Sequence, residues 1–275
     1  MAQSAWVQRY GRWAIVTGAS SGIGRACALE AARRGLDVVI VARREDELRR
    51  LAAEIAAIGR ASRIMAADLA DPDAVAGVMA DIADLDIGLL VAAAGFGTAG
   101  DFLAIDTRQE LEMIDVNCRA VFQLVRGLAP RMAARRRGGI VLFGSIVAFQ
   151  GVARAANYAA TKAYAQVLAE GLHRELKPLG IDVLASAPGP VNTGFAARSD
   201  LQMGAATSAE TVARATLNAL GKRAIVRPGL LSKLLIYGLA TAPRALRGRI
   251  MSSIMQGMTR HHAPRDPEGQ AHTPG

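Results

Sequence analysis

The chain has 275 residues, 51% of them hydrophobic, which excludes an intrinsically disordered protein and allows one large α/β domain. Lysine and arginine number 33 against 24 acidic residues, and the resulting net charge of +9 indicates an anionic cofactor, nucleic acid or an anionic surface as a partner. The basic residues form short pairs and one triplet, and only 4% of the chain is aromatic. We therefore do not expect nucleic-acid binding.

The cysteine and histidine content indicates neither a disulfide framework nor a metal site. Cys27 and Cys118 are the only cysteines, and His261 and His262 lie in a polar stretch with nothing nearby to complete a ligand set. The N-terminal residues do not resemble a signal peptide, and no run of 18 uncharged apolar residues occurs. We expect a cytoplasmic protein.

Short apolar runs alternate with helical patterns along most of the chain. The predicted strands cover residues 13–17, 37–42, 62–67, 87–93, 139–144, 181–187 and 223–227. The predicted helices cover residues 22–34, 72–83, 107–136, 153–177 and 208–220. This alternation is typical of a doubly wound, parallel α/β sheet, here of about seven strands.

We predict a single domain over residues 1–227, because no change in composition divides that range. Residues 228–260 have the apolar spacing of two amphipathic helices that Pro243 separates, and we interpret them as an extension of the same domain. Residues 261–275 contain three prolines and little apolar content, which predicts a mobile tail.

A glycine-rich segment, TGASSGIG at residues 17–24, lies between the first predicted strand and the first helix. At this position in a doubly wound sheet, a dinucleotide binds with its pyrophosphate at the helix N-terminus. Gly18 allows the tight turn, while Gly22 and Gly24 allow close approach of the backbone. We expect the cofactor contacts of this segment from Gly18, Ser20, Ser21, Gly22, Ile23 and Gly24.

The end of the second strand predicts which cofactor binds. An acidic residue there would hold the ribose 2′-hydroxyl of NAD, but this chain has Ala42 followed by Arg43 and Arg44. Arginine binds phosphate through charge-assisted, bidentate hydrogen bonds, and Ser20 adds a hydroxyl. We therefore predict NADP (NADPH) rather than NAD. The alternative is that both arginines are solvated residues that open a helix.

Tyr158 and Lys162 are four residues apart in the alanine-rich stretch NYAATKA, so they share one helical face. A free tyrosine has a pKa of about 10, and a lysine ammonium one turn away favours the phenolate, as would the positive ring of an oxidised nicotinamide. Ser145 stands thirteen residues before Tyr158, at the end of a predicted strand. Taken alone, each of these residues is also compatible with an ordinary surface helix or a helix cap.

Together, these motifs resemble the short-chain dehydrogenase/reductase family, over residues 11 to about 227. The glycine spacing G-x-x-x-G-x-G, the Y-x-x-x-K motif, Ser145, and Asn117 within DVNCRA carry the resemblance. It implies a Rossmann fold and a catalytic tetrad of Ser145, Tyr158, Lys162 and Asn117. Tyr158 would exchange the proton, Ser145 would bind the substrate oxygen, and Lys162 would also bind the nicotinamide ribose. Asn117 would hold a water molecule that links Lys162 to solvent.

The same resemblance implies further cofactor contacts. The sequence also departs from the family pattern at two places. The contacts are Asp68, Leu69, Ala94, Gly95, Pro188, Gly189, Val191 and Thr193, with Asp68 on the adenine and Thr193 on the carboxamide. Residues 92–95 read AAAG where the family has N-N-A-G, so we expect lower stability or weaker cofactor binding. Residues 142–144 read LFG in place of N-I-S, which predicts altered hydrogen bonding beside Ser145.

The predicted substrate contacts are Ser145, Phe96, Val147, Phe149 and Phe195, which are mostly apolar. They indicate a hydrophobic ketone, aldehyde or alcohol, although core packing explains apolar residues equally well. The helical extension would pack over this site or against another subunit of a homodimer or homotetramer. Alternatively, its arginines would contact an anionic membrane surface. The rival to an enzyme is a cofactor-binding regulatory or scaffold protein with the same fold.

Overall fold

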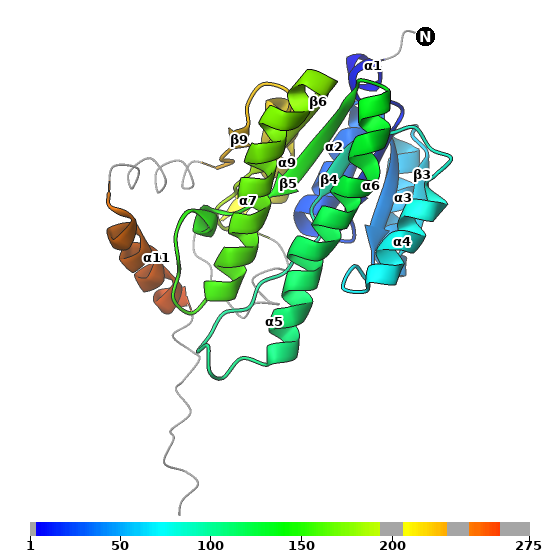
Figure 1. Ribbon diagram of the computed structural model, residues 1–275. Helices are drawn as coiled ribbons and strands as arrows, with labels where there is room; N and C mark the ends of the chain where they lie inside the picture. Colours follow the sequence, from blue (N-terminus) through cyan, green and yellow to red (C-terminus); the bar gives the residue numbers. More distant parts are fainter. Residues whose placement is uncertain (1–3, 193–205, 230–241, 259–275) are drawn as a thin grey trace, which may run out of the picture.

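A computed structural model describes residues 4–192, 206–229 and 242–258, and a seven-stranded parallel sheet lies at its centre (Figure 1). The strand order is β3-β2-β1-β4-β5-β6-β9, and every neighbouring pair is parallel. The bounds are β1 (Trp13–Thr17), β2 (Asp37–Ala42), β3 (Ser62–Ala66), β4 (Ile87–Ala92), β5 (Gly138–Phe143), β6 (Ile181–Ser186) and β9 (Ile225–Val226). The predicted doubly wound sheet is therefore confirmed.

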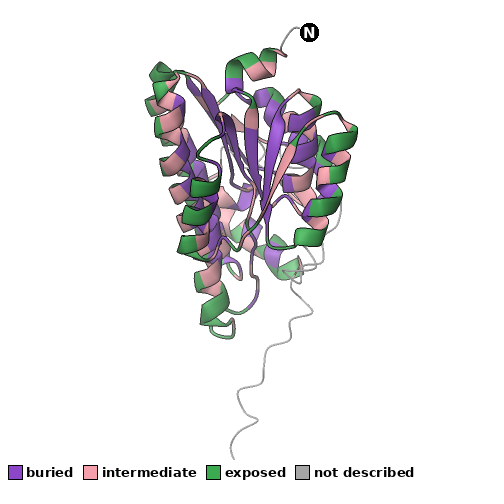
Figure 2. Ribbon diagram, turned by 90° about the vertical axis from the view of Figure 1, so that its right-hand side faces the viewer, coloured by how far each residue is buried: buried purple, intermediate pink, exposed green. Residues whose placement is uncertain are grey.

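Helices cover both faces of this sheet and bury it almost completely (Figure 2). One apolar cluster joins the sheet to α2 (Gly22–Arg33), α3 (Glu45–Ala57) and α9 (Ala209–Ala219). The other joins it to α4 (Pro72–Asp81), α6 (Ala120–Ala134) and α7 (Ala156–Leu176). Successive strand residues point to opposite faces, so Val16 belongs to the first cluster and Ile15 to the second. Such two-sided burial explains why the strands are continuous apolar runs.

The chain reverses its winding between β1 and β4, which both leave the sheet at the same edge. At that switch point the connections after the two strands separate, and ligands of doubly wound sheets bind in the resulting crevice. Residues 18–21 follow β1, and residues 93–106 follow β4. The fold thus places the glycine-rich segment beside Ala94 and Gly95.

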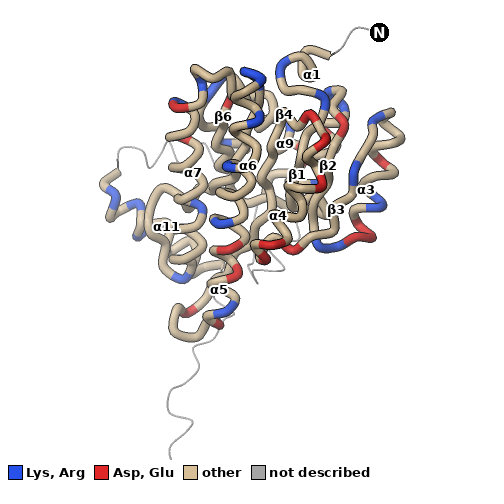
Figure 3. Tube along the Cα trace, turned by 45° about the vertical axis from the view of Figure 1, so that its right-hand side comes forward, with Lys and Arg blue, Asp and Glu red and all other residues tan. Residues whose placement is uncertain are grey.

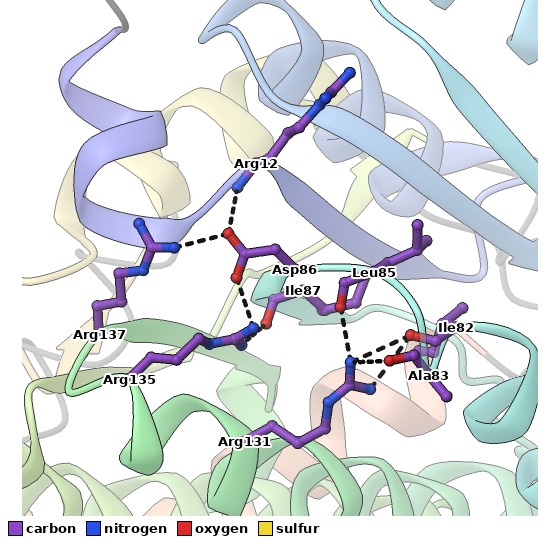
Figure 4. A network of polar contacts seen from close by, with 9 residues as sticks. All are labelled: Arg12, Ile82, Ala83, Leu85, Asp86, Ile87, Arg131, Arg135 and Arg137. Carbon is purple, nitrogen blue, oxygen red and sulfur yellow. Dashed lines mark hydrogen bonds and ion pairs between the residues drawn. The ribbon is translucent and has the colours of Figure 1, made fainter.

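At the opposite end of the sheet, where the strands begin, both basic and acidic residues occur (Figure 3). Several of them form ion pairs (Figure 4). The Asp86 carboxylate, just before β4, lies 2.6 Å from Arg135 Nη1 and 2.8 Å from Arg137 Nη2. Arg131 donates hydrogen bonds to the backbone carbonyls of Ile82, Ala83 and Leu85, which follow α4. These bonds join α6 to the segment that connects α4 to β4.

The structure differs from the predicted elements at several boundaries. The helix predicted over residues 107–136 is divided into α5 (Thr107–Ile114), a π-helical turn (Asp115–Arg119) and α6. The one predicted over 153–177 begins at Ala156, after a 3₁₀ turn (Ile146–Phe149). Two helices not predicted are α3 and α1 (Ala5–Tyr10), and Ser4 caps the latter. A two-stranded sheet pairs β7 (Val191–Asn192) with β8 (Thr207–Ser208).

The C-terminal extension is described only in part. Its second predicted helix is α11 (Arg244–Met258), which begins directly after Pro243, and its first falls mostly within residues 230–241, outside the described residues. Figure 1 shows α11 beside the edge where the strands end. Among the described residues, no helix combines the length and apolar character that a bilayer crossing requires.

Candidate active site

A cavity of about 620 Å³ opens at the edge where β1, β4 and β5 end. Its volume lies within the range of small-molecule sites. Most of the predicted cofactor contacts line it: Gly18, Ser20, Ser21, Gly22, Ile23, Gly24, Arg43, Arg44, Asp68, Leu69, Ala94, Gly95, Tyr158, Lys162, Pro188, Gly189 and Val191. Ser145, Phe96 and Val147 line it as well. Thr193 and Phe195 lie outside the described residues.

The glycine-rich turn has the close backbone packing that a phosphate cradle needs. Gly18 has a φ of +67°, and a Cβ there would lie 2.8 Å from the Ala94 backbone nitrogen. A Cβ on Gly24 would lie 2.3 Å from the Gly18 carbonyl oxygen, so α2 can pack this closely only on glycine. Ser21 caps α2 without a side-chain hydrogen bond to its first N–H groups. The helix N-terminus therefore faces the cavity in the way that suits a pyrophosphate.

Two arginines gather at the far end of this cavity, beside the glycine turn. The Arg44 Nη2 atom lies 3.2 Å from Ser20 Oγ, and Arg43 Nη1 lies 3.4 Å from both Asp68 Oδ2 and Glu112 Oε1. These long contacts hold the half-exposed Arg43 loosely. The arrangement fits a ribose 2′-phosphate, which would meet two guanidiniums and a hydroxyl. Glu112 also lines the cavity, although no sequence motif includes it, so the sequence alone did not predict its contact with Arg43.

Tyr158, Lys162 and Ser145 converge at the other end of the cavity. Tyr158 and Lys162 come from the first turns of α7. Ser145 lies two residues after the end of β5, directly before the 3₁₀ turn. A hydrogen bond joins the Tyr158 and Ser145 hydroxyls. Lys162 Nζ donates to the Phe143 carbonyl over 3.2 Å and lies 5.8 Å from the centre of the Tyr158 ring. Within the described part of the chain, no carboxylate forms an ion pair with Lys162.

Burial controls the protonation of both groups in the protein without cofactor. It raises the pKa of Tyr158 to about 12, and the hydrogen bond with Ser145 opposes this shift. Burial also lowers the pKa of Lys162 to about 8. The expectation that Lys162 and an oxidised nicotinamide together favour the phenolate concerns the enzyme with bound cofactor and stays a prediction.

Asn117 sits in the π-helical turn and is buried. Its Nδ2 donates to the Phe96 carbonyl over 2.9 Å and to Thr161 Oγ1 over 3.0 Å, while Oδ1 accepts from the Phe96 N–H over 3.2 Å. Both amide donors are thus used within the protein. A Cβ on Gly95 would lie only 2.8 Å from Asn117 Oδ1, which explains the glycine. Single π-helical turns occur frequently at functional sites.

The structure gives a local reason for the glycine before Ser145, whereas the lower stability or weaker cofactor binding expected from Ala92 and Ala93 stays a prediction. The Ala94 N–H donates to Thr17 Oγ1 over 3.0 Å, so a hydroxyl and a backbone amide link β1 to the β4 connection. A Cβ on Gly144 would lie 2.8 Å from Oε1 of the buried Gln166. The glycine therefore makes room for that larger side chain.

Apolar side chains from α11 close the substrate end of the cavity. Met251 and Met255 are buried against Val147 and Val152, and Tyr158 packs against the same cluster. The Ala153 N–H donates to Ser252 Oγ over 2.9 Å, which ties α11 to the chain before α7. Ile254 and Met258 also line the cavity. In its described part, the extension therefore packs against the cavity, and its role toward a substrate or another subunit stays a prediction.

Phe149, like the buried Asn117, is a described residue of the predicted site that does not line the cavity. The guanidinium of Arg227 lies 5.3 Å from the centre of the Phe149 ring, and Phe149 does not line the cavity. The 3₁₀ turn over residues 146–149 directs Ile146 and Val147 to the cavity instead. Phe149 thus lies outside the lining of this cavity, and its expected substrate contact stays a prediction.

The chain resembles known proteins over most of its length. The short chain dehydrogenase family profile matches residues 12–204. A 7beta-hydroxysteroid dehydrogenase from Clostridium sardiniense is 33% identical over 187 residues, which cover 68% of this chain and 72% of that protein. A structure determined to explain the stereoselectivity of a 7beta-hydroxysteroid dehydrogenase superimposes with a TM-score of 0.82 at 26% identity, covering 89% and 98% of the two chains.

A second solved structure contains a cofactor. It is a short-chain dehydrogenase from Sphingobium yanoikuyae in complex with NADPH, with a TM-score of 0.74 and 29% identity over 94% of this chain and 99% of that one. The profile match covers more than half of this chain and includes the glycine turn, Ser145, Tyr158 and Lys162. The chain therefore belongs to the short-chain dehydrogenase/reductase family and is an oxidoreductase of alcohol and carbonyl groups.

Proposed function

We propose that this protein is an NADP(H)-dependent oxidoreductase that interconverts a hydrophobic ketone or aldehyde and the corresponding alcohol. One observation carries the proposal. A single cavity joins the glycine turn and the two arginines to Ser145, Tyr158 and Lys162. A cofactor-binding protein without turnover would need the first group but not the second.

The protein's own residues would hold the substrate oxygen and move one proton. NADP(H), when bound, supplies or accepts the hydride. Ser145 and Tyr158 would both hydrogen-bond the carbonyl oxygen, and such donors stabilise the negative charge that develops on it. Because its pKa is about 12, Tyr158 carries its proton at neutral pH and can donate it during reduction. Lys162, still mostly charged at pH 7, would then stabilise the phenolate.

The preference for NADP rests on the arginine end of the cavity. Arg43 and Arg44 both line it, and Ser20 accepts a hydrogen bond from Arg44. The buried acid that would hold a free 2′-hydroxyl is replaced by Ala42. The NADPH complex of the Sphingobium relative supports the same assignment.

The substrate class follows from the wall opposite the cofactor. Val147, Met251 and Met255 are apolar and buried, and methionine adapts its shape to irregular partners. The relative from Clostridium sardiniense is a hydroxysteroid dehydrogenase, which supports a bulky, fused-ring substrate. We therefore propose that a large apolar ketone or secondary alcohol reacts here.

The direct test is a screen of carbonyl compounds that follows the absorbance of reduced nicotinamide. The panel would contain steroid ketones, long-chain aliphatic ketones and ketones that carry a carboxylate or phosphate. We expect turnover of large apolar ketones with NADPH and much slower reaction with NADH. Tight NADPH binding in a fluorescence titration, combined with no turnover of any member in either direction, would support a binding protein and contradict the enzyme.

A further inference from the structure

Thr161 lies between Tyr158 and Lys162 in sequence. Its side chain does not line the cavity, whereas theirs do. Its hydroxyl is buried and makes two hydrogen bonds. It accepts one from Asn117 Nδ2 over 3.0 Å and donates its single proton to the Tyr158 carbonyl over 2.9 Å. No motif in the sequence marks this residue as part of the site.

These bonds continue a chain that crosses three separate elements. The Phe96 backbone, after β4, forms two hydrogen bonds with the Asn117 side-chain amide. The second N–H of this amide donates to the Thr161 hydroxyl. Thr161 then bonds back to the first turn of α7. Cys118 Sγ adds a weak contact, 3.9 Å from the Thr161 carbonyl. Both donors of the Asn117 amide and the proton of the Thr161 hydroxyl are used, so each group fixes the orientation of the next.

We propose that Thr161 is a positioning residue that sets the register of α7 against the π-helical turn. That register determines where Tyr158 meets Ser145 and where Lys162 Nζ reaches the Phe143 carbonyl. The proposal rests on the proposed function, because Tyr158 is taken as the proton donor. Thr161 itself does not line the cavity, so it acts on the reaction only through its neighbours.

A series at position 161 separates the hydroxyl from its surroundings. Thr161→Val keeps the shape of the side chain but removes both hydrogen bonds, whereas Thr161→Ser keeps the hydroxyl and removes only the methyl group. We expect Thr161→Val to lower kcat about tenfold to hundredfold, because small displacements of catalytic groups have effects of this size. Thr161→Ser should retain kcat within about threefold, and the NADPH Kd should change less than kcat in both variants.

Two readouts distinguish positioning from general stability. Hydrogen exchange should increase in peptides that cover residues 115–119 and 158–162 of Thr161→Val, and the pH midpoint of alcohol oxidation should move. Thr216→Val is the matched control, because Thr216 is also buried, its hydroxyl lies 2.8 Å from Ser186 Oγ, and neither residue lines the cavity. It should lower stability and leave kcat and the pH midpoint unchanged.

Several outcomes would overturn the proposal. They are unchanged kcat and pH midpoint in Thr161→Val, equal loss of kcat in Thr216→Val, or a loss in Thr161→Ser as large as in Thr161→Val. If Thr161→Val does not fold, Thr161→Ala and Thr161→Ser provide the same contrast. A wild-type protein without NADPH-dependent turnover would refute the proposed function instead, and the hydrogen-exchange result would still test the register.

Discussion

The two ends of the central sheet, where its strands begin and where they finish, differ in how their charged side chains are paired. Where the strands begin, Asp37, Asp86 and Asp182 are each paired with arginine at 2.6–2.8 Å. Where they end, Arg43 makes longer contacts of 3.4 Å with Asp68 and Glu112. Among the described residues, the buried Lys162 has a backbone carbonyl as its one hydrogen-bond partner, and its pKa falls to about 8. The first end therefore pairs its charges closely, whereas the second holds a charge in an environment that disfavours it.

The difference indicates which end stabilises the fold and which performs chemistry. Paired charges lower the energy of the folded chain when their geometry is good, but they are fixed in one state. An unpaired ammonium and a buried phenol raise that energy, and groups with perturbed pKa values of this kind cluster at functional sites. We therefore expect substitutions at the first end to change stability and those at the second to change activity.

The largest expected effect is on turnover. Tyr158→Phe keeps the ring that packs against the α11 cluster and removes only the hydroxyl. General acid–base groups contribute about 10²–10⁴-fold, so kcat should fall by at least the lower value. Thermal unfolding and NADPH binding should remain close to wild type. Turnover near the wild-type rate on a good substrate would mean that another group donates the proton.

The next expected effect is that of Lys162→Met, which should change both stability and activity. Lys162 has a folded pKa of about 8 and an ordinary value of 10.5, so the folded chain binds this proton more weakly than the unfolded chain. The resulting cost is complete below pH 8 and disappears as the pH rises to 10.5. Lys162→Met should thus stabilise the cofactor-free protein by up to about 3 kcal/mol at pH 7, less the lost hydrogen bond, while activity and cofactor affinity fall.

Denaturant unfolding of both proteins across that pH range is the measurement. The difference in unfolding free energy should shrink from pH 8 to pH 10.5. A difference that stays constant across this range would show that Lys162 is not destabilised by burial.

At the opposite end, Asp86→Asn should lower stability without changing kcat per folded molecule. The substitution leaves Arg135 and Arg137 facing each other, and these charges already disfavour one another. Because the carboxylate is about one-third exposed, we expect a loss of about 2 kcal/mol, between the values for surface and buried pairs. Asp84→Asn, in an exposed pair with Arg63, is the control and should change little. An equal effect of the two variants would remove the special role of the Asp86 network.

The smallest effect concerns cofactor choice. Arg43→Ala should weaken NADPH binding by about 1–2 kcal/mol and NADH binding much less, because only NADPH has the 2′-phosphate. The expected loss of binding free energy is small because Arg43 is about half exposed, so water screens its charge. Arg50→Ala, on an exposed pair with Glu47, should leave both affinities unchanged. Titrations in which Arg43→Ala weakens both cofactors equally would contradict the NADP assignment.

Local patterns predicted the sheet and most of the cavity lining. Continuous apolar runs between glycines mark strands buried on both faces, and the glycine turn, Ser145, Tyr158 and Lys162 lie at strand or helix ends that short motifs identify. The π-helical turn could not be predicted, because residues 107–136 have an uninterrupted helical pattern. Its cause is tertiary, since Asn117 bonds to Phe96 and Thr161 from other elements.

The same reason limits what motifs show within the site. The Tyr158 pKa in the cofactor-free protein depends on how completely the fold removes water, and a sequence motif shows only the neighbouring charge. The 3₁₀ turn that directs Phe149 to Arg227 has no motif either. Glu112 and Thr161 lacked any signal, because their neighbours come from distant parts of the chain.

The packing of α11 has a consequence for how substrate range can diverge. The wall formed by Met251 and Met255 comes from residues beyond 204, where the family profile ends, whereas the cofactor cradle and the proton-transfer groups all lie before it. Among the described residues, apolar packing and the Ser252 hydrogen bond join the two. Under the proposed function, we expect exchange of this terminal helix between relatives to change substrate preference and leave the residues of proton transfer in place. Selectivity and chemistry would then be inherited as separate segments of one chain.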